Sequence, residues 1–292
     1  MATRADPPLI AIVGPTSSGK TDLAIKLAKR FNGAIICADS RTVYRDFDIG
    51  SAKPTVAEMD CVPHYMLNVV KLNEQFSLYD FQRLANKYIK EIRRKGQIPF
   101  LVGGSGLYVD SILFDYQLGP EPDSKLRQML NKMSVHDLLE LLKEQHIEIP
   151  SNFNNKRHLI RAIEQNGVNR TQHQSIIDNA YVVGISTDKD VIEKRIRDRA
   201  IQMLGNGLVE ETRQLIEEYG DVEPLRNNSM GEAQKFLRGE VNRDDLIERM
   251  VIVDRQLAKK QMTWFRRNKQ IKWLPLDEAE KYVVDLLTSH HK

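Results

Sequence analysis

The fold is decided by a short stretch near the N-terminus, Leu9-Ile10-Ala11-Ile12-Val13-Gly14-Pro15-Thr16-Ser17-Ser18-Gly19-Lys20-Thr21. It joins an apolar run to the pattern G-x-x-x-x-G-K-T, the phosphate-binding loop between a strand and a helix. Gly14 and Gly19 permit backbone angles that a side chain would hinder, so successive N–H groups can point into one anion-sized hollow. Lys20 adds a positive charge, and the Thr21 hydroxyl is placed to hold Mg²⁺. The stretch therefore predicts a site for a phosphate compound.

The rest of the chain alternates between short apolar runs and helical patterns. Buried strands are predicted at residues 34–38, 98–102 and 181–185, in addition to the apolar run before the loop. Helices are predicted at residues 78–95 and 243–267, as well as directly after the loop. Such alternation is typical of a parallel sheet covered by helices. We therefore predict an α/β fold with a P-loop NTPase-like parallel sheet flanked by helices.

A change in sequence pattern near residue 115 indicates an insertion. Pro120 and Pro122 break the preceding pattern, and the sequence is then mostly helical and polar up to about residue 177. The strand pattern returns only afterwards. We therefore predict a helical insertion domain at residues 116–177, within a core formed by residues 1–115 and 178–292.

Composition excludes a membrane protein and a disulfide framework. The chain has 292 residues, of which 41% are hydrophobic and 28% charged, and it has no apolar run long enough to span a membrane. Its N-terminus lacks the apolar segment of a secretory signal. Two cysteines, Cys37 and Cys61, are too few for a disulfide framework and have no metal-ligand spacing. We expect a monomeric protein in the reducing cytoplasm, with no membrane partner.

The net charge of +3 is unevenly distributed along the chain. Residues 255–272 contain no acidic residue, and all their charges are basic, so the remainder of the chain sums to about −4. Such a segment indicates either a polyanionic partner or an ordinary solvated helix face. The basic residues are Arg255, Lys259, Lys260, Arg266, Arg267, Lys269 and Lys272.

Two further segments follow predicted strands. Asp39 lies at the carboxyl end of a strand, where open α/β sheets place their ligands, although Asp also favours helix N-caps. Gly103-Gly104-Ser105-Gly106 follows the next strand along the chain. Its glycines would allow the backbone to approach a ligand closely, or would only form a tight turn.

Taken together, these segments resemble the tRNA dimethylallyltransferases, which prenylate an adenosine beside the anticodon. The resemblance follows the family's order over nearly the whole chain. The matching motifs are Gly14-Pro15-Thr16-Ser17-Ser18-Gly19-Lys20-Thr21, Ala38-Asp39-Ser40, Val43-Tyr44, Asp48-Ile49-Gly50-Ser51-Ala52-Lys53-Pro54, Gly103-Gly104-Ser105-Gly106-Leu107-Tyr108, Arg161-Ala162-Ile163-Glu164, Gly207-Leu208-Val209-Glu210-Glu211 and Ala258-Lys259-Lys260-Gln261-Met262-Thr263-Trp264-Phe265-Arg266.

The resemblance implies a reaction and roles for particular residues. The phosphate loop would bind dimethylallyl diphosphate rather than hydrolyse a nucleotide. Asp39 would act as general base for the adenine exocyclic amine, Ser105 would lie near the reacting nucleotide, and Arg199 would hold the diphosphate. Mg²⁺ is expected at Thr21 and Asp39, since a strand-end aspartate beside such a loop resembles the magnesium ligand of nucleotide kinases.

The resemblance also implies a tRNA anticodon stem-loop as partner. An adenine inside an RNA loop must leave its stack to react, which favours arginine and aromatic groups nearby. The implied tRNA-binding residues are Asp39, Ser40, Arg41, Thr42, Ser105, Arg127, Arg157, Arg161, Lys259, Lys260, Gln261, Trp264 and Arg266.

Three segments depart from the family pattern. The run Gly231-Glu232-Ala233-Gln234 stands where the family usually has Gly-Tyr-Lys-Glu, Asp254 stands in place of a usual threonine, and His158 in place of an arginine. Other functions also fit parts of the sequence. A nucleotide kinase would share the loop and Asp39 but gives no reason for the basic segment around Trp264. A prenyltransferase acting on free adenylate would share the catalytic half, and an RNA-binding NTPase without transfer activity would share the loop.

Overall fold

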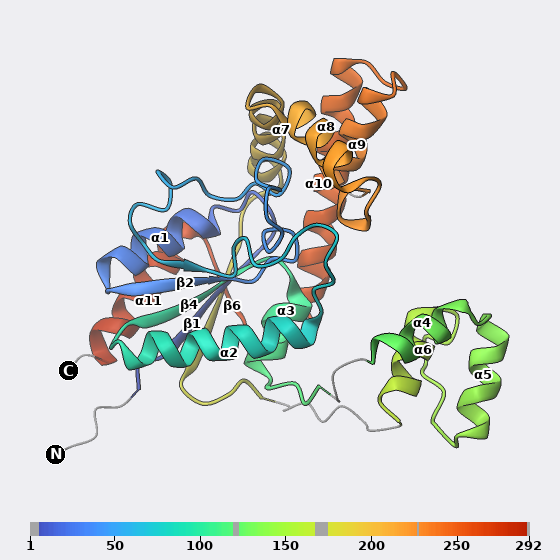
Figure 1. Cartoon of the computed structure of the whole chain (residues 1–292). Coiled ribbons are helices and arrows are strands. Elements are labelled where there is room, and N and C mark those ends of the chain that lie inside the picture. The colour runs from blue at the N-terminus through green and yellow to red at the C-terminus, as the bar shows by residue number, and fades with distance from the viewer. Residues whose placement is uncertain (1–5, 119–122, 167–174, 227, 291–292) are drawn as a thin grey trace. The chain divides into compact units, whose positions relative to one another are not determined.

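The structure is a computed structural model, and it describes residues 6–118, 123–166, 175–226 and 228–290. The chain forms two compact units (Figure 1). The larger, which we call the core unit, consists of Met1–Leu113 and Ile176–Lys292. The smaller, which we call the helical unit, consists of Phe114–Ser175.

A six-stranded sheet forms the centre of the core unit, and all its strand pairs are parallel. The phosphate loop follows β1, whose residues are all buried. This confirms the predicted P-loop NTPase-like sheet. In spatial order, the strands are β3 (His64–Tyr65), β2 (Gly33–Cys37), β4 (Ile98–Gly103), β1 (Leu9–Val13), β5 (Ala180–Ile185) and β6 (Lys272–Leu274).

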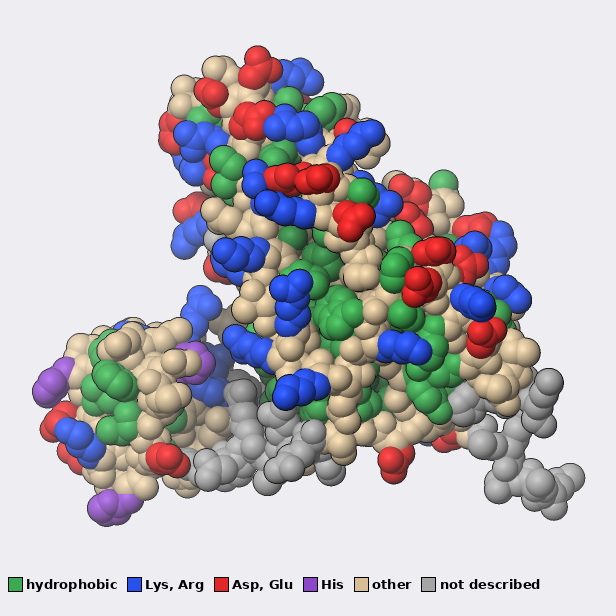
Figure 2. Space-filling view, turned by 180° about the vertical axis from the view of Figure 1, so that it is seen from behind, with side chains coloured by type: hydrophobic (Ala, Val, Ile, Leu, Met, Phe, Trp, Pro, Cys, Tyr) green, Lys and Arg blue, Asp and Glu red, His purple; other side chains and the backbone are tan. Residues whose placement is uncertain are grey.

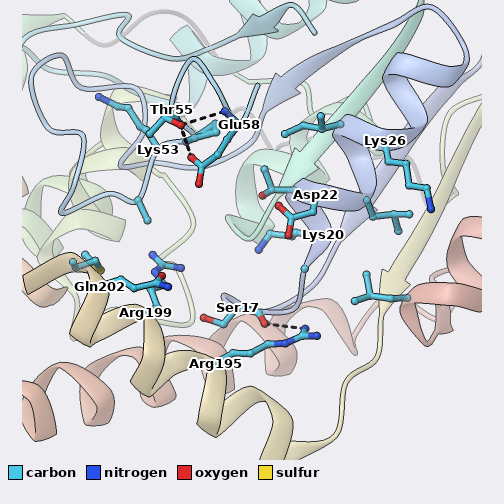
Figure 3. Close-up of a pocket in the computed structure, with 18 of the residues that line it drawn as sticks. Ser17, Lys20, Asp22, Lys26, Lys53, Thr55, Glu58, Arg195, Arg199 and Gln202 are labelled. Carbon is cyan, nitrogen blue, oxygen red and sulfur yellow. Dashed lines mark hydrogen bonds between the residues drawn. The ribbon is translucent and has the colours of Figure 1, made fainter. Parts of the chain in front are cut away.

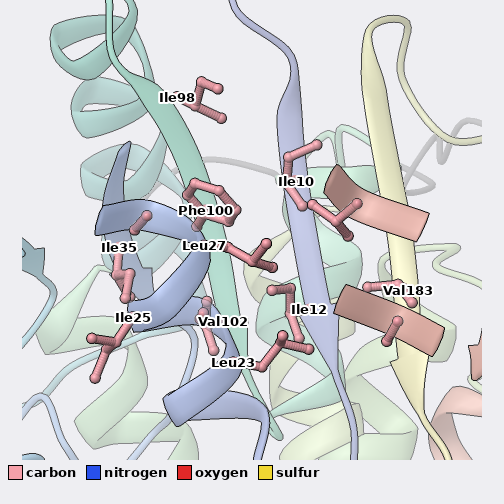
Figure 4. Close-up of a cluster of buried hydrophobic side chains, with 14 of the residues drawn as sticks. Ile10, Ile12, Leu23, Ile25, Leu27, Ile35, Ile98, Phe100, Val102 and Val183 are labelled. Atoms are coloured by element: carbon pink, nitrogen blue, oxygen red, sulfur yellow. The ribbon is translucent and has the colours of Figure 1, made fainter. Parts of the chain in front are cut away.

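Helices cover both faces of the sheet. Figure 1 shows α1 and α11 on one face and α2 and α3 on the other, in agreement with their contacts. On the first face, Leu23 and Leu27 of α1 pack against Ile10 and Phe100 of the sheet (Figure 4). Burial of these apolar side chains holds the loop between β1 and α1 in place. The helices are α1 (Lys20–Arg30), α2 (Leu78–Arg94), α3 (Gly106–Leu113) and α11 (Leu276–His290).

A second group of helices in the core unit has its own apolar core. Met203, Leu208, Met230 and Met250 are buried together there. Because α7 follows the sheet strand β5 and α10 leads back to β6, this group is connected to the sheet at both ends. Its elements are α7 (Lys189–Gly205), α8 (Leu208–Tyr219), a 3₁₀ turn (Glu223–Leu225), α9 (Asn228–Leu237) and α10 (Arg243–Phe265).

The buried side of α10 differs from the apolar stripe that the sequence predicts. Periodicity places Leu246, Met250, Val253, Leu257 and Trp264 inside. Of these, only Leu246 and Met250 are fully buried. The stripe is shifted because α10 packs first on other helices and then on polar loops at the sheet. Its buried residues are Leu246, Met250, Val251, Asp254, Ala258, Gln261 and Phe265.

In its described residues, the helical unit contains three short helices around a small apolar core. Each helix begins at a polar N-cap whose side chain accepts a backbone N–H bond: Asp123, Ser134 and Asn155. The break predicted at Pro120 and Pro122 lies outside the described residues. The helices are α4 (Ser124–Lys132), α5 (Val135–Glu144) and α6 (Lys156–Glu164), and their core includes Leu130, Leu138, Leu142, Leu159 and Ile163.

Candidate active site

The phosphate loop is held by its own backbone and by Lys20. Ser17 and Gly19 have φ angles of 61° and 85°, which turn the loop so that it enters α1 directly. Lys20 Nζ donates a hydrogen bond to the Pro15 carbonyl at 3.0 Å. The hydroxyl oxygens of Ser17 and Ser18 are buried without a hydrogen-bond partner among the described residues. Buried polar atoms of this kind, beside backbone N–H groups, fit a bound oxyanion.

The charged groups of Asp39 and Arg199 lie near Lys20. Burial lowers its pKa from 10.5 to about 8, while Asp39 opposes this change and Arg199 adds to it. The structure thus brings together three residues that the sequence singles out, from α1, the end of β2 and α7. Two cations and a carboxylate lie close to one phosphate-binding loop.

A cavity of about 900 Å³ opens beside the loop and is lined by Lys20, Thr21 and Arg199 (Figure 3). Arg195, which the sequence alone does not assign to the site, lines it as well and reaches toward the Ser17 carbonyl. Its position four residues before Arg199 on a helix was the available signal. Other basic residues of the cavity are paired with acids, namely Lys26 with Glu280 and Lys53 with Asp48.

Asp48 and Ile49 line the cavity, and a single carboxylate holds the backbone of residues 48–50. Glu211 on α8 accepts the backbone N–H groups of Asp48, Ile49 and Gly50 at 2.8, 2.7 and 2.7 Å. Three N–H donors around one carboxylate fix the backbone strongly. The two motifs that contain these residues are far apart in the sequence and are joined here.

Asp39 and Ser105 lie on adjacent loops at the carboxyl ends of β2 and β4. The Ser105 N–H donates to the Ala38 carbonyl at 3.1 Å, and Ser105 Oγ accepts the Ser40 N–H at 3.0 Å. Asp39 Oδ1 accepts the Arg41 N–H at 2.8 Å. A Cβ on Gly103 would lie 2.0 Å from the Ala38 carbonyl oxygen, so glycine is required there.

The residues after Asp39 differ in accessibility. Ser40 is exposed, whereas Thr42 is only 7% exposed, and its hydroxyl faces the Asp39 carbonyl at 3.5 Å. Arg41 extends toward the 3₁₀ turn, where it donates to the Pro224 carbonyl at 3.3 Å. These contacts fix the loop that presents Asp39.

The remaining glycines of the Ser105 loop make room for α10. A Cβ on Gly104 would lie 2.2 Å from Gln261 Nε2, and one on Gly106 would lie 2.1 Å from Trp264 Cδ1. The close approach that the sequence indicates is therefore to side chains of the protein itself. Trp264 Nε1 in turn donates to Asp110 Oδ2 at 2.7 Å, and burial raises the pKa of Asp110 to about 6.

The basic segment lies at the end of α10 and just after it. Lys259, Lys260 and Arg266 are exposed, whereas Gln261 between them is 9% exposed. Arg255 is paired with Glu193 on α7 at 2.7 Å. Figure 2 shows Lys and Arg side chains following one another down the core unit on the face that it displays. The exposed charges form a surface suited to a polyanion.

The helical unit holds the other predicted RNA-contacting arginines. Arg127 Nε donates to Glu164 Oε1 at 2.6 Å, and Arg161 Nη1 donates to Glu164 Oε2 at 3.4 Å. The Glu164 side chain is 2% exposed. One buried carboxylate therefore holds two arginines, while Arg157 is exposed on the same helix as Arg161.

Two of the three departures from the family pattern are buried. Asp254 is 4% exposed, and burial raises its pKa while the charge of Arg199 lowers it. Glu232 is 9% exposed and pairs with Lys235 at 2.8 Å. His158 is exposed on α6.

Comparison with known proteins agrees with the resemblance seen in the sequence. Residues 42–268 match the family described as IPP transferase. A tRNA dimethylallyltransferase of Synechococcus elongatus is 37% identical over 309 residues, which cover 100% of this chain and 99% of that protein. The chain belongs to the tRNA dimethylallyltransferase family. Membership in the tRNA dimethylallyltransferases confirms the resemblance and gives no support to a nucleotide kinase.

Further members of the tRNA dimethylallyltransferase family show similar agreement. The tRNA dimethylallyltransferase of Staphylococcus epidermidis is 34% identical, with 94% of this chain and 88% of that protein covered. The crystal structure of a tRNA isopentenylpyrophosphate transferase from Bacillus halodurans is 34% identical and has a TM-score of 0.74. That match covers 97% of this chain and 98% of the other. None of the helices in the described ranges is long and apolar enough to cross a membrane.

Proposed function

We propose that this protein transfers a dimethylallyl group from dimethylallyl diphosphate to the exocyclic amine of the adenosine beside a tRNA anticodon, and releases diphosphate. The observation that carries the proposal is the environment of Lys20, where a phosphate loop, a second cation and a carboxylate meet. The two cations can stabilise the negative charge of the diphosphate leaving group, and the carboxylate can accept the proton of the amine. Family membership supports the same reaction.

The proposed reaction forms one bond and breaks another. The amine nitrogen of adenosine attacks the first carbon of the dimethylallyl group, and the bond from that carbon to the diphosphate oxygen breaks. The electron pair of the broken bond leaves with the diphosphate, where Lys20, Arg199 and the loop N–H groups stabilise the charge. The amine loses a proton to Asp39 as the new bond forms. Ser105 holds the Asp39 loop through its bond from Ser40.

We propose Thr21 and Asp39 as the residues that would hold Mg²⁺. No cluster of three or more His, Cys, Asp or Glu side chains suited to a metal exists within the described ranges. A hydroxyl and a carboxylate are nevertheless donors that suit Mg²⁺, which usually keeps several waters and binds substrate phosphates in addition to one or two protein ligands. The ion would supply charge neutralisation to the diphosphate.

We further propose that basic residues of both units bind the phosphates of the anticodon stem-loop. Lys259, Lys260 and Arg266 would do so from the core unit. Arg127, Arg157 and Arg161 would do so from the helical unit. Phosphate contacts of this kind position an RNA without reading its sequence. A monomer in the cytoplasm remains our prediction.

The test is to incubate the protein with dimethylallyl diphosphate and either an anticodon stem-loop or AMP, and to analyse the products by mass spectrometry. We expect one dimethylallyl group on the stem-loop and none on AMP. The Lys20→Ala variant serves as the control, because it lacks the charge next to the diphosphate. Equal use of AMP would instead support the adenylate prenyltransferase, and rapid RNA-independent ATP hydrolysis would support an NTPase.

A further inference from the structure

The phosphate loop has one hydrogen bond to a residue near the opposite end of the chain. The Thr16 backbone N–H donates to Gln261 Oε1 at 2.7 Å, and the bond is buried. Thr16 is 5% exposed and Gln261 is 9% exposed. Because a backbone N–H can only donate, this contact also fixes which end of the Gln261 amide faces the loop. Helix α10 is thus joined to the phosphate loop at a point closed to solvent.

A second hydrogen bond continues from Thr16 to Arg199. Arg199 Nη1 donates to Thr16 Oγ1 at 2.6 Å, and Arg199 lines the cavity together with Lys20. Arg199 Nε is buried and has no hydrogen-bond partner in the described part of the chain. The Thr16 hydroxyl is therefore important for the direction in which the guanidinium points. A shift of Thr16 would move a cation that we assign to the diphosphate.

The Gln261 amide has little freedom to move away from Thr16. Its nitrogen packs on the backbone of Gly104, where an added Cβ would lie only 2.2 Å from Nε2. The amide is thereby confined between the phosphate loop and the loop that carries Ser105. A side chain confined on both sides holds the groups that it contacts in fixed positions.

We propose that Gln261 is a positioning residue for the diphosphate rather than a contact for RNA. The inference rests on the proposed function and deepens it. Loss of the Gln261 oxygen would leave a buried N–H without an acceptor, and the loop would rearrange at the expense of its phosphate-binding geometry. The adjacent Lys259 and Lys260 are exposed. One helix would therefore bind RNA on one side and hold the phosphate loop on the other.

The first test is the Gln261→Met variant, which keeps the length of the side chain and removes the acceptor. Its control is Gln256→Met, the same change at an exposed position of α10. We expect Gln261→Met to bind inorganic pyrophosphate about tenfold more weakly by calorimetry at neutral pH. Its dissociation constant for an anticodon stem-loop should change by less than about twofold. The control should match the wild-type protein in both measurements.

The second test is a double-mutant cycle with Thr16→Val, which removes the hydroxyl that Arg199 contacts and keeps the N–H. If the two contacts act in series, the double variant should bind pyrophosphate within about twofold of the weaker single variant. If the losses of affinity in the two single variants multiply in the double variant, the two contacts act independently and not in series. Thermal melting of each variant shows whether the fold is retained.

Two results would overturn the inference. If Gln261→Met weakens stem-loop binding and leaves pyrophosphate affinity intact, then Gln261 contacts RNA. If both affinities fall in parallel with the melting temperature, the residue only maintains the fold. A wild-type protein that binds pyrophosphate but does not prenylate the stem-loop would refute the proposed function alone, because the pyrophosphate measurement involves no RNA chemistry.

Discussion

The lowered pKa of Lys20 predicts that binding of dimethylallyl diphosphate depends on pH in a specific range. With a pKa of about 8, caused mainly by burial, the ammonium group is about 90% protonated at pH 7 but only about 9% protonated at pH 9. The diphosphate binds best to the protonated form. Affinity should therefore fall about twofold from pH 7 to pH 8 and about tenfold from pH 7 to pH 9.

Deprotonation of Lys20 changes ligand affinity and the free energy of unfolding in opposite directions. The pKa of Lys20 in the free protein lies below its usual value of 10.5, so the unfolded chain binds more protons between about pH 8 and pH 10.5. Over that range, the contribution of Lys20 to the free energy of unfolding rises with pH. Ligand affinity falls over the same range. A general loss of structure at alkaline pH would lower both together.

Calorimetric titration with dimethylallyl diphosphate, without RNA, measures the effect between pH 7 and pH 9. The terminal phosphate of the ligand has a second pKa of about 6, so its charge is constant over that range. The Lys20→Ala variant should bind weakly and with the same affinity at every pH. Constant affinity of the wild-type protein up to pH 9, or an equal decline in the variant, would refute the inference that the Lys20 ammonium group causes the pH dependence.

Two substitutions test the other parts of the proposal. Asp39→Asn should lower single-turnover prenylation at least about 100-fold and leave stem-loop affinity within about twofold, and near-normal turnover would exclude Asp39 as the base. Replacing Lys259 and Arg266 by Ala should reduce the slope of log affinity against log salt by up to about one unit for each phosphate that the variant no longer neutralises. Identical slopes for the variant and the wild-type protein would mean that these side chains are only solvated and contact no phosphate.

The sequence predicts those parts of the fold that depend on local patterns. The loop that contains Gly19 and Lys20, the apolar strands beside it and the long helix before Gly96 all have strong signals within a few residues. The sequence does not predict strand β3, because His64 and Tyr65 are too few for a periodic pattern. It does not predict helix α3 either, since that helix begins within a glycine-rich motif that favours a turn.

The proximity of Asp39 to Lys20 also follows from a general rule. Parallel strands place their carboxyl ends at one edge of the sheet, so the residues after β1 and β2 must lie near each other. The sequence did not reveal the role of Glu211, which fixes residues 48–50 from a helix that begins at Leu208. No local pattern joins a carboxylate to backbone groups that are so distant along the chain.

The buried side of α10 is the element for which the prediction from apolar periodicity is wrong. The apolar stripe predicted from periodicity does not include Asp254 and Gln261, although both are buried. A buried polar side chain requires a partner, and Gln261 has the Thr16 N–H of the phosphate loop. Gln261 therefore lies where α10 contacts the loops of the site, whereas Asp254 lies near Arg199 of α7. A polar residue at a core position of such a helix is evidence for a functional contact, even where its partner cannot be named from the sequence.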